Sequence, residues 1–351
     1  MFKRIFILML TSLFIFSLFS EDKRIITDTT GKNVELKKEI KRIAVVPIPW
    51  ASIVYAIDGK GDRIVGMHPS SKKSYDECIL KKMSPALSSV ATNYVGSDFQ
   101  MSMEEVIKLK ADVMIVWDYQ EKEIEQLKAL GIPAVSLRYG TLEYLQKGIL
   151  VIGNILNRQK AAEELVQYHK DTIKFFDEKK EKLEKLKKPK VLYMRDEQLK
   201  IAGKGSINNI FIESAGGVNV AKDVPGQWVN VTIEQIMAWD PEIIFMSNFS
   251  DFTPSDVLEN KIKAQDWSKI SAVKNKKVYK TPMGIYRWDA PCSETPLMMK
   301  WMAKIQQSEI FKEIDIEKEI KTFYKKFFNY DLNRNDLDWI LQKKNNIESK
   351  K

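Results

Sequence analysis

Aromatic residues recur directly after apolar runs that predict β-strands. In open α/β sheets, ligands bind beyond the carboxyl ends of the strands. Aromatic side chains there can wall a flat or apolar ligand and shield it from water. The set therefore predicts an aromatic cleft between two halves of the chain, lined by Trp50, Trp117, Tyr119, Tyr139, Trp228, Tyr286 and Trp288.

Three arginines, Arg138, Arg195 and Arg287, follow predicted strands in a chain whose basic residues are mostly lysines. A guanidinium keeps its charge and offers a planar fork of donors that suits carboxylate or catecholate oxygens. If the three converge, they predict an anionic ligand such as a ferric siderophore. The alternative is internal pairing, for example with Asp196, Asp289 or Glu294.

Resident metal chemistry has few candidates, because the chain contains two histidines and two cysteines. That count excludes a multi-cysteine zinc or iron–sulfur centre. His68 ends a predicted strand and could ligate a metal, with Tyr94 or Tyr286 as a partner, or could be a hydrogen-bonded loop histidine. We expect Cys78 and Cys292 to be free thiols, since a disulfide between the two halves would clamp the cleft.

The elements that would position these residues alternate as in parallel α/β proteins. Strands are predicted over 42–48, 63–68, 112–117, 132–137, 190–194, 242–247 and 277–282. Helices are predicted over 103–110, 122–130, 207–215, 232–239 and 295–306. Residues 141–188 contain no proline and two glycines, and their apolar positions recur at helical spacing, which predicts a stiff connecting helix.

The N-terminus has the pattern of a cleaved secretory signal peptide. Lys3 and Arg4 precede an apolar run of about 15 residues, which is short for a membrane span. No cysteine ends this run, so a lipoprotein anchor is not expected. The net charge of +9 arises largely from mixed Lys/Glu runs typical of solvated helix faces, and we expect no nucleic-acid partner.

Six segments, in order, resemble the periplasmic binding proteins of iron-siderophore, haem and cobalamin ABC importers. The residues 26–46 are similar to that family's opening hairpin and first strand, and MSMEEVIKLKADVMIVW (101–117) to a characteristic helix and strand. LKALGIPAVSL (127–137) matches the next unit. The second half continues with IFIESAGGVNVA (210–221), 228–247 and 267–282. The loop after the first strand, PIPWASIVYAID (47–58), departs from the family pattern.

The resemblance implies an α/β fold of class III, with two lobes, a ligand cleft between them and one long rigid helix joining them. The corresponding domains are a signal peptide (1–20), an N-terminal lobe (21–140), a connecting helix (141–188) and a C-terminal lobe with tail helices (189–351). It also implies that Glu104 and Glu213, one on each lobe, dock onto arginines of the two permease subunits.

The functional expectation is a monomeric periplasmic protein that captures a chelated metal, a ferric siderophore first, and delivers it to an inner-membrane ABC permease. Haem, cobalamin or a small nickel or cobalt chelate are alternatives. No intrinsic cofactor is expected. A secreted metalloenzyme is disfavoured, since histidine–carboxylate clusters, a GxSxG elbow and a P-loop are missing from the sequence. A membrane-tethered sensor would require an uncleaved N-terminus.

Overall fold

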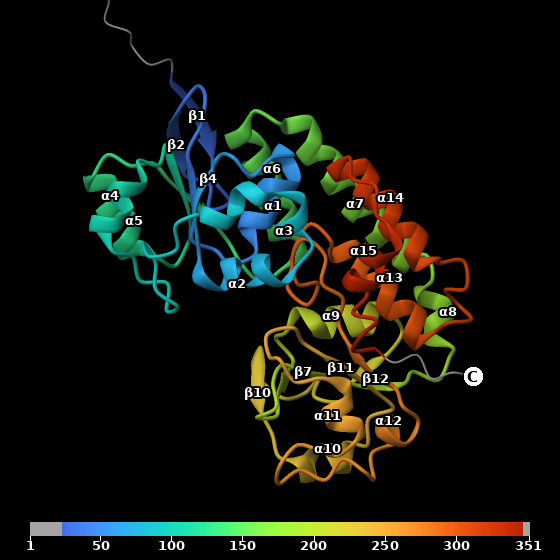
Figure 1. Cartoon of the computed structure of the whole chain (residues 1–351). Coiled ribbons are helices and arrows are strands. Elements are labelled where there is room, and N and C mark those ends of the chain that lie inside the picture. Colours follow the sequence, from blue (N-terminus) through green and yellow to red (C-terminus); the bar gives the residue numbers. More distant parts are fainter. Residues whose placement is uncertain (1–22, 347–351) are drawn as a thin grey trace, which may run out of the picture.

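The computed structural model describes residues 23–346, which form two α/β lobes stacked one above the other (Figure 1). The predicted signal peptide lies outside the described residues. A hairpin of β1 (Lys23–Thr27) and β2 (Asn33–Lys37) opens the chain, as the resemblance implied. No helix among residues 23–346 is long and apolar enough to cross a membrane.

The N-terminal lobe is built on a parallel sheet with the strand order β4-β3-β5-β6. Its strands are β3 (Ile43–Val45), β4 (Ile64–Met67), β5 (Val113–Trp117) and β6 (Ala134–Leu137). Its helices are α1 (Trp50–Asp58), α2 (Pro69–Glu77), α3 (Leu80–Met83), the 3-10 helix over Pro85–Ser89, α4 (Met103–Leu109) and α5 (Glu121–Ala129).

The C-terminal lobe is built on a mixed sheet with the order β10-β8-β7-β11-β12, and β9 pairs with the start of β7. The strands are β7 (Lys190–Met194), β8 (Lys200–Ala202), β9 (Val218–Asn219), β10 (Trp228–Asn230), β11 (Ile243–Met246) and β12 (Val278–Lys280). The helices in this lobe are α9 (Ile207–Ser214), α10 (Ile233–Trp239), α11 (Pro254–Leu258) and α12 (Ser271–Lys274).

The connecting segment is not one long helix, which corrects the prediction for 141–188. It consists of α6 (Leu142–Leu156), α7 (Gln159–Asp177) and α8 (Lys180–Glu184). Asn157 adopts a left-handed conformation that ends α6 and lets α7 fold back against it. Helix α6 packs on α1 and β1 of the N-terminal lobe, so α7 is the helix that runs from one lobe to the other.

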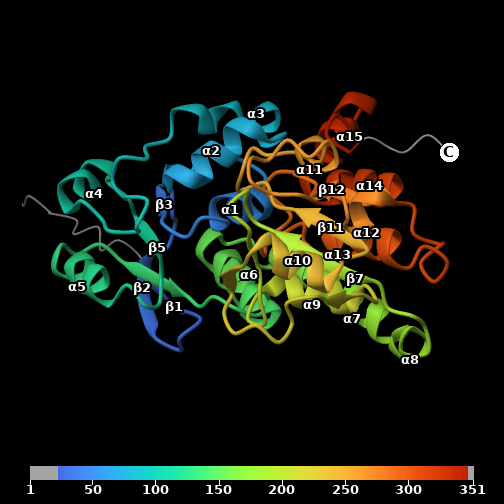
Figure 2. The ribbon, with the colours of Figure 1, turned by 90° about the horizontal axis from the view of Figure 1, so that it is seen from below.

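The lobes are also joined a second time, whereas the sequence predicted a single connection. Three C-terminal helices, α13 (Thr295–Gln306), α14 (Ile316–Phe328) and α15 (Arg334–Ile340), follow the C-terminal lobe. In both ribbon views α13 and α14 lie on the same side of the molecule as α7, and α14 also contacts α1 (Figures 1 and 2). Lys82 of α3 pairs with Asp336 of α15 at 2.8 Å across the lobe boundary.

One apolar core runs through both lobes without interruption. It contains Ile53 of α1, Leu165 of α7, Val191 of β7 and Phe323 of α14, all nearly fully buried. Two smaller cores cover the outer sheet faces of the C-terminal and N-terminal lobes. Because the main core does not stop at the lobe boundary, the lobes share stabilising contacts as well as a linker.

Apart from the connecting helix, every strand and helix predicted from the sequence forms, with bounds shifted by at most three residues. The segment after the first strand, treated as a loop, is instead the fully buried helix α1. Its residues are apolar on all sides, which removes the amphipathic pattern that identifies a surface helix. No bounds were predicted for the tail helices, which are α14 and α15. The short strands β8 to β10 and the helices α2, α3, α11 and α12 were not predicted.

Gly148 allows α6 to lie against Trp50. A Cβ at position 148 would collide with the indole ring of Trp50. We therefore expect Gly148→Ala to destabilise the protein by about 1–3 kcal/mol, as overpacked core sites do, measured by urea unfolding. Leu150→Ala on the exposed side of the same helix is the control. A Gly148→Ala variant as stable as wild type would show that Trp50 can move aside.

Candidate functional site

The N-terminal lobe presents an aromatic cluster at the ends of β5 and β6. The rings of Trp117 and Tyr119 stack with their centres 6.2 Å apart, and Tyr139 meets Trp117 edge-on at 5.5 Å. Trp117 is buried, whereas Tyr119 and Tyr139 are 61% and 42% exposed. Trp50, Trp117, Tyr139 and Pro291 line a cavity of about 10 Å³ at the lobe boundary. The aromatic residues predicted for this lobe therefore lie together at the strand ends, and their role as a wall for a ligand stays a prediction.

The C-terminal lobe brings two of the three predicted arginines together. The guanidinium carbons of Arg195 and Arg287 each lie 4.8 Å from the ring centre of Phe249, and Arg195 also lies 5.1 Å from the ring of Trp228. Stacking on aromatic rings holds a guanidinium in place while leaving its N–H groups available in the ring plane. Phe249 was missed from the sequence, although it follows β11 as the other aromatics follow their strands.

Arg138 does not join this pair. It forms a 3.5 Å ion pair with Asp118 of its own lobe and lies over the ring of Tyr144. Arg287 pairs with Glu77 of α2 at 3.4 Å, rather than with Asp289 or Glu294. The convergence of all three arginines that the sequence suggested is thus reduced to Arg195 and Arg287.

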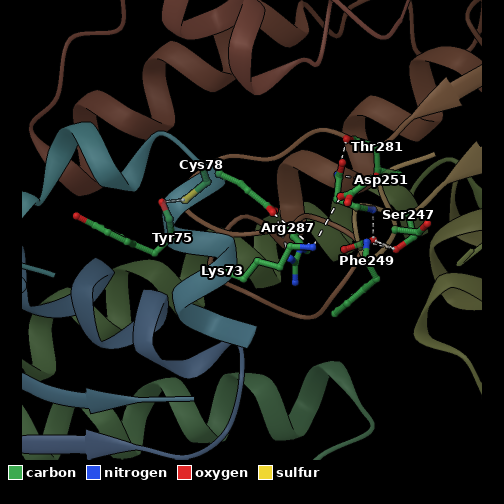
Figure 3. A network of polar contacts seen from close by, with 12 residues as sticks. Lys73, Tyr75, Cys78, Ser247, Phe249, Asp251, Thr281 and Arg287 are labelled. Carbon is green, nitrogen blue, oxygen red and sulfur yellow. Dashed lines mark hydrogen bonds and ion pairs between the residues drawn. The ribbon is translucent and has the colours of Figure 1, made fainter. Parts of the chain in front are cut away.

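A buried polar network fixes the loops that carry Phe249 and Arg287. Asp289 accepts hydrogen bonds from the Ser247 hydroxyl and from the backbone N–H of Asn248. The Asn248 amide donates in turn to the carbonyl of Thr281 at 2.7 Å. Figure 3 shows this part of the network around Ser247, Phe249, Thr281 and Arg287. The loops after β11 and β12 are therefore tied to one another.

The two lobes touch directly across the cleft. Gln227 donates a 2.7 Å hydrogen bond to the Tyr139 hydroxyl, and Lys73 of α2 lies 3.8 Å from Asp251. The Glu77–Arg287 pair is a third contact. Figure 3 shows Lys73, Asp251 and Arg287 at this boundary. At Trp50 the lobes leave a cavity of about 10 Å³, whereas Lys73, Arg195, Phe249 and Asp251 line a hollow of about 710 Å³ between α2 and the C-terminal lobe. A large solute bound at Trp50 would require the contacts across the cleft to separate.

The structure places Tyr94 and His68 inside the N-terminal lobe. The Tyr94 hydroxyl donates to the carbonyl of Val45 at 2.7 Å. His68 is buried, and its Nδ1 accepts the N–H of Ser70 at the start of α2. Burial lowers the pKa of His68, which favours the neutral ring. Both side chains serve local structure, and the predicted metal ligation by His68 finds no partner in Tyr94 or in Tyr286.

Tyr286 and Trp288 are also buried and form part of the interior beside Arg287. Large apolar bodies in a loop between two lobes favour the core over the cleft surface. Cys78 and Cys292 are buried free thiols. Between residues 23 and 346, no group of three or more His, Cys, Asp or Glu side chains could hold a metal ion.

Glu104 and Glu213 lie on separate lobes and both are exposed. Glu104 is in the first turn of α4, with its side chain 80% exposed and 2.8 Å from Lys108. Glu213 is on α9 and lines a hollow of about 460 Å³ together with Lys180, Lys188 and Lys222. Both carboxylates can therefore be reached by a partner protein.

Residues 44–283 match the family described as periplasmic binding protein. This chain belongs to that family. It is 49% identical to a periplasmic solute binding protein from Veillonella parvula, whose crystal structure superposes with a TM-score of 0.89 over 93% of this chain and 98% of that one. The solved relatives share the class III bilobed architecture expected from the sequence.

The chain is also 27% identical to the molybdate-binding protein MolA of Haemophilus influenzae, over 87% of this chain and 91% of MolA. The structure of MolA bound to molybdate covers 88% of this chain with a TM-score of 0.75 at 23% identity, a likeness of fold. The family and these relatives are binding components of ABC importers, which supports binding and transport as the general function.

Proposed function

We propose that this protein binds an anionic solute between its lobes in the periplasm and delivers it to an ABC permease. The observation that carries the proposal is the pair Arg195 and Arg287, which both stack on Phe249 at the edge of the C-terminal lobe. Across from them stand Tyr139 and the rest of the aromatic cluster, in contact through Gln227.

The state of Arg287 supports an anionic ligand. Its side chain is 3% exposed, its Nε has no hydrogen-bond partner, and the Glu77 carboxylate lies at 3.4 Å. A buried guanidinium with incomplete hydrogen bonding is unfavourable, and an anion placed against it would supply acceptors. The site is therefore electrostatically prepared for a negative solute.

Among anions, a small oxyanion is the first candidate. The lobes already meet around the arginines, and a compact tetrahedral anion needs little separation to reach them. MolA, which this chain resembles over nearly its whole length, is named for binding molybdate. An oxyanion also offers several acceptors to two guanidinium forks at once.

A ferric siderophore is the second candidate, favoured by the exposed rings of Tyr119 and Tyr139. These rings provide contact area that a molybdate-sized ligand would not use. A chelate of that size requires the lobes to open further than an oxyanion does. Haem, cobalamin and nickel or cobalt chelates are further candidates. For these ligands, contact with aromatic rings matters more than charge.

Titration of tryptophan fluorescence with molybdate, a ferric tris-catecholate, haem and cobalamin tests the proposal. Arg195→Ala and Arg287→Ala should each weaken binding of the anions about ten- to over a hundredfold, the worth of a charged hydrogen bond. Arg334→Ala is the matched control. Arg334 is an exposed arginine of α15 that pairs with Glu317 of α14. Unchanged anion affinity in both cleft variants would contradict the proposed site.

Glu77 competes with the solute for Arg287. Removing its charge with Glu77→Gln should raise the affinity for molybdate roughly two- to fivefold. The anion must displace Glu77 from Arg287, and breaking this partly exposed ion pair costs a small part of the binding free energy. Asp76→Asn, which changes the neighbouring carboxylate paired with Lys72, should have no such effect. Calorimetric titration of the three proteins measures the difference, and a weaker Glu77→Gln complex would show that Glu77 helps to hold the solute.

Docking is proposed to use Glu104 and Glu213. Exposed ion pairs are individually weak, so recognition depends on both engaging together. The double variant Glu104→Ala/Glu213→Ala should lose solute uptake in cells that carry the permease while keeping solute affinity. The double variant Glu121→Ala/Glu234→Ala, on exposed sites of α5 and α10, is the control. Loss of solute affinity would place Glu104 or Glu213 in the binding site instead.

A further inference from the structure

Glu294 is a fully buried carboxylate that contacts no part of the cleft. It lies at the start of α13, and both of its oxygens are used. Oε1 accepts a 2.7 Å hydrogen bond from the Tyr324 hydroxyl of α14. Oε2 accepts from the backbone N–H groups of Ile285 at 2.9 Å and Tyr286 at 3.3 Å. One side chain thus ties a C-terminal helix to the segment 285–286.

That segment leads directly into the solute site. Arg287, which stacks on Phe249, is the next residue, and Asp289 follows two positions later. Asp289 holds the Ser247–Asn248 turn that carries Phe249. Glu294 therefore fixes the backbone from which Arg287 projects. The same backbone leads to Asp289, which orients the turn that carries Phe249.

The backbone at Gly284 is matched to this arrangement. A Cβ at that position would collide with the Glu294 carboxylate and press on the Tyr324 hydroxyl. The amide of Gly284 also bonds to the carbonyl of Tyr286, which closes the turn at 2.9 Å. Only a residue without a Cβ allows the backbone at position 284 to lie this close to the Glu294 carboxylate.

We propose that Glu294 is a positioning residue of the solute site: it holds the turn 284–287 against α14 so that Arg287 is presented to the cleft. This inference rests on the proposed anion site, since it assigns Glu294 its role through Arg287. It also makes the C-terminal helices part of the binding apparatus, because Tyr324 is the other anchor of the carboxylate.

Two acceptor oxygens are what Glu294 contributes to this link. Its partners are the Tyr324 hydroxyl and the backbone N–H groups of Ile285 and Tyr286. A hydroxyl can donate or accept, so a glutamine could replace the carboxyl group by donating its NH₂ to Tyr324 and accepting the two N–H groups on its oxygen. Glu294→Met removes both acceptors with little change in volume and therefore breaks the link.

Hydrogen exchange read by mass spectrometry tests the positioning directly. In Glu294→Met, the peptide that contains Ile285 and Tyr286 should exchange faster than in wild type, while Glu313→Met, at an exposed carboxylate of the same lobe, should leave it unchanged. Unchanged exchange in Glu294→Met would overturn the proposal. Tyr324→Phe, which keeps the carboxylate but removes one donor, should give an intermediate increase.

Molybdate titration shows whether the effect reaches the solute through Arg287. Glu294→Met should weaken molybdate binding about tenfold, the worth of one charged hydrogen bond, but should have no further effect in an Arg287→Ala background. Equal losses in both backgrounds, or no loss where Arg287→Ala shows one, would overturn the role of Glu294. If Arg287→Ala itself binds molybdate as wild type does, the proposed solute site is at fault instead.

The pH dependence of unfolding tests a separate point, whether Glu294 titrates as a buried carboxyl group. Burial raises the pKa of Glu294 to about 7, against the opposing hydrogen bond from Tyr324. The folded protein therefore holds this proton more tightly than the unfolded chain, so the contribution of Glu294 to stability is greatest below its ordinary pKa and is lost as pH rises through 7.

Neighbouring groups must be separated from this effect. Cys78 and Cys292 face Glu294, and burial keeps both thiols protonated by raising their pKa values. His169 of α7 bonds to the carbonyl of Ser293, and burial lowers its pKa to about 4, so its contribution falls as the pH is lowered. The measured quantity is consequently the difference in thermal midpoint between wild type and Glu294→Gln. It should shift in favour of wild type from pH 8 to pH 5, and parallel curves would contradict the buried carboxylate's titration.

Discussion

The continuous apolar core around α7 is the constraint on which the rest of this structure depends. Residues of α1, α7, β7 and α14 belong to one buried cluster, so neither lobe has a complete core of its own. Separating the lobes fully would expose this cluster, at about 25 cal/mol for each Å² of apolar surface. Opening is therefore restricted to the cleft side, where the contacts are polar and few, such as Gln227 to Tyr139 and Lys73 to Asp251.

This asymmetry between an apolar back and a polar front suits a capture protein. The polar contacts at the front can be exchanged for contacts to a solute at little net cost, because hydrogen bonds to water or solute replace them. The apolar contacts at the back hold the two lobes in the same relative position while the polar contacts exchange. Arg287 illustrates the exchange: Glu77 of the opposite lobe lies against it in this structure, at the place where an anion would bind.

The sequence predicted the architecture well because strand and helix patterns are local. Apolar runs followed by amphipathic runs identified every long strand of both sheets. The strand-end rule selected Trp117, Tyr139, Arg195 and Arg287, which lie near the lobe boundary and whose binding role stays a prediction. It could not tell which strand-end residues turn inward: Tyr286 and Trp288 are buried although they flank Arg287. Interlobe partners such as Glu77 and Gln227 depend on tertiary contacts between positions far apart in the chain, for which the sequence has no periodic signal. The break at Asn157 was missed because one left-handed residue suffices to end a helix without proline or glycine.

Glu294 connects the shared core to the proposed solute site. A solute site built on loops requires those loops to be fixed. Helix α14 does both, because its Tyr324 bonds to the Glu294 carboxylate and its Phe323 belongs to the core shared by the lobes. His169 of α7 bonds to Ser293, the residue before Glu294, so both interlobe connections converge on one short stretch. A change in lobe angle that moves α7 or α14 would therefore be felt at residues 285–287. On the proposed role of Glu294, closure and the orientation of Arg287 are coupled through hydrogen bonds that do not touch the solute.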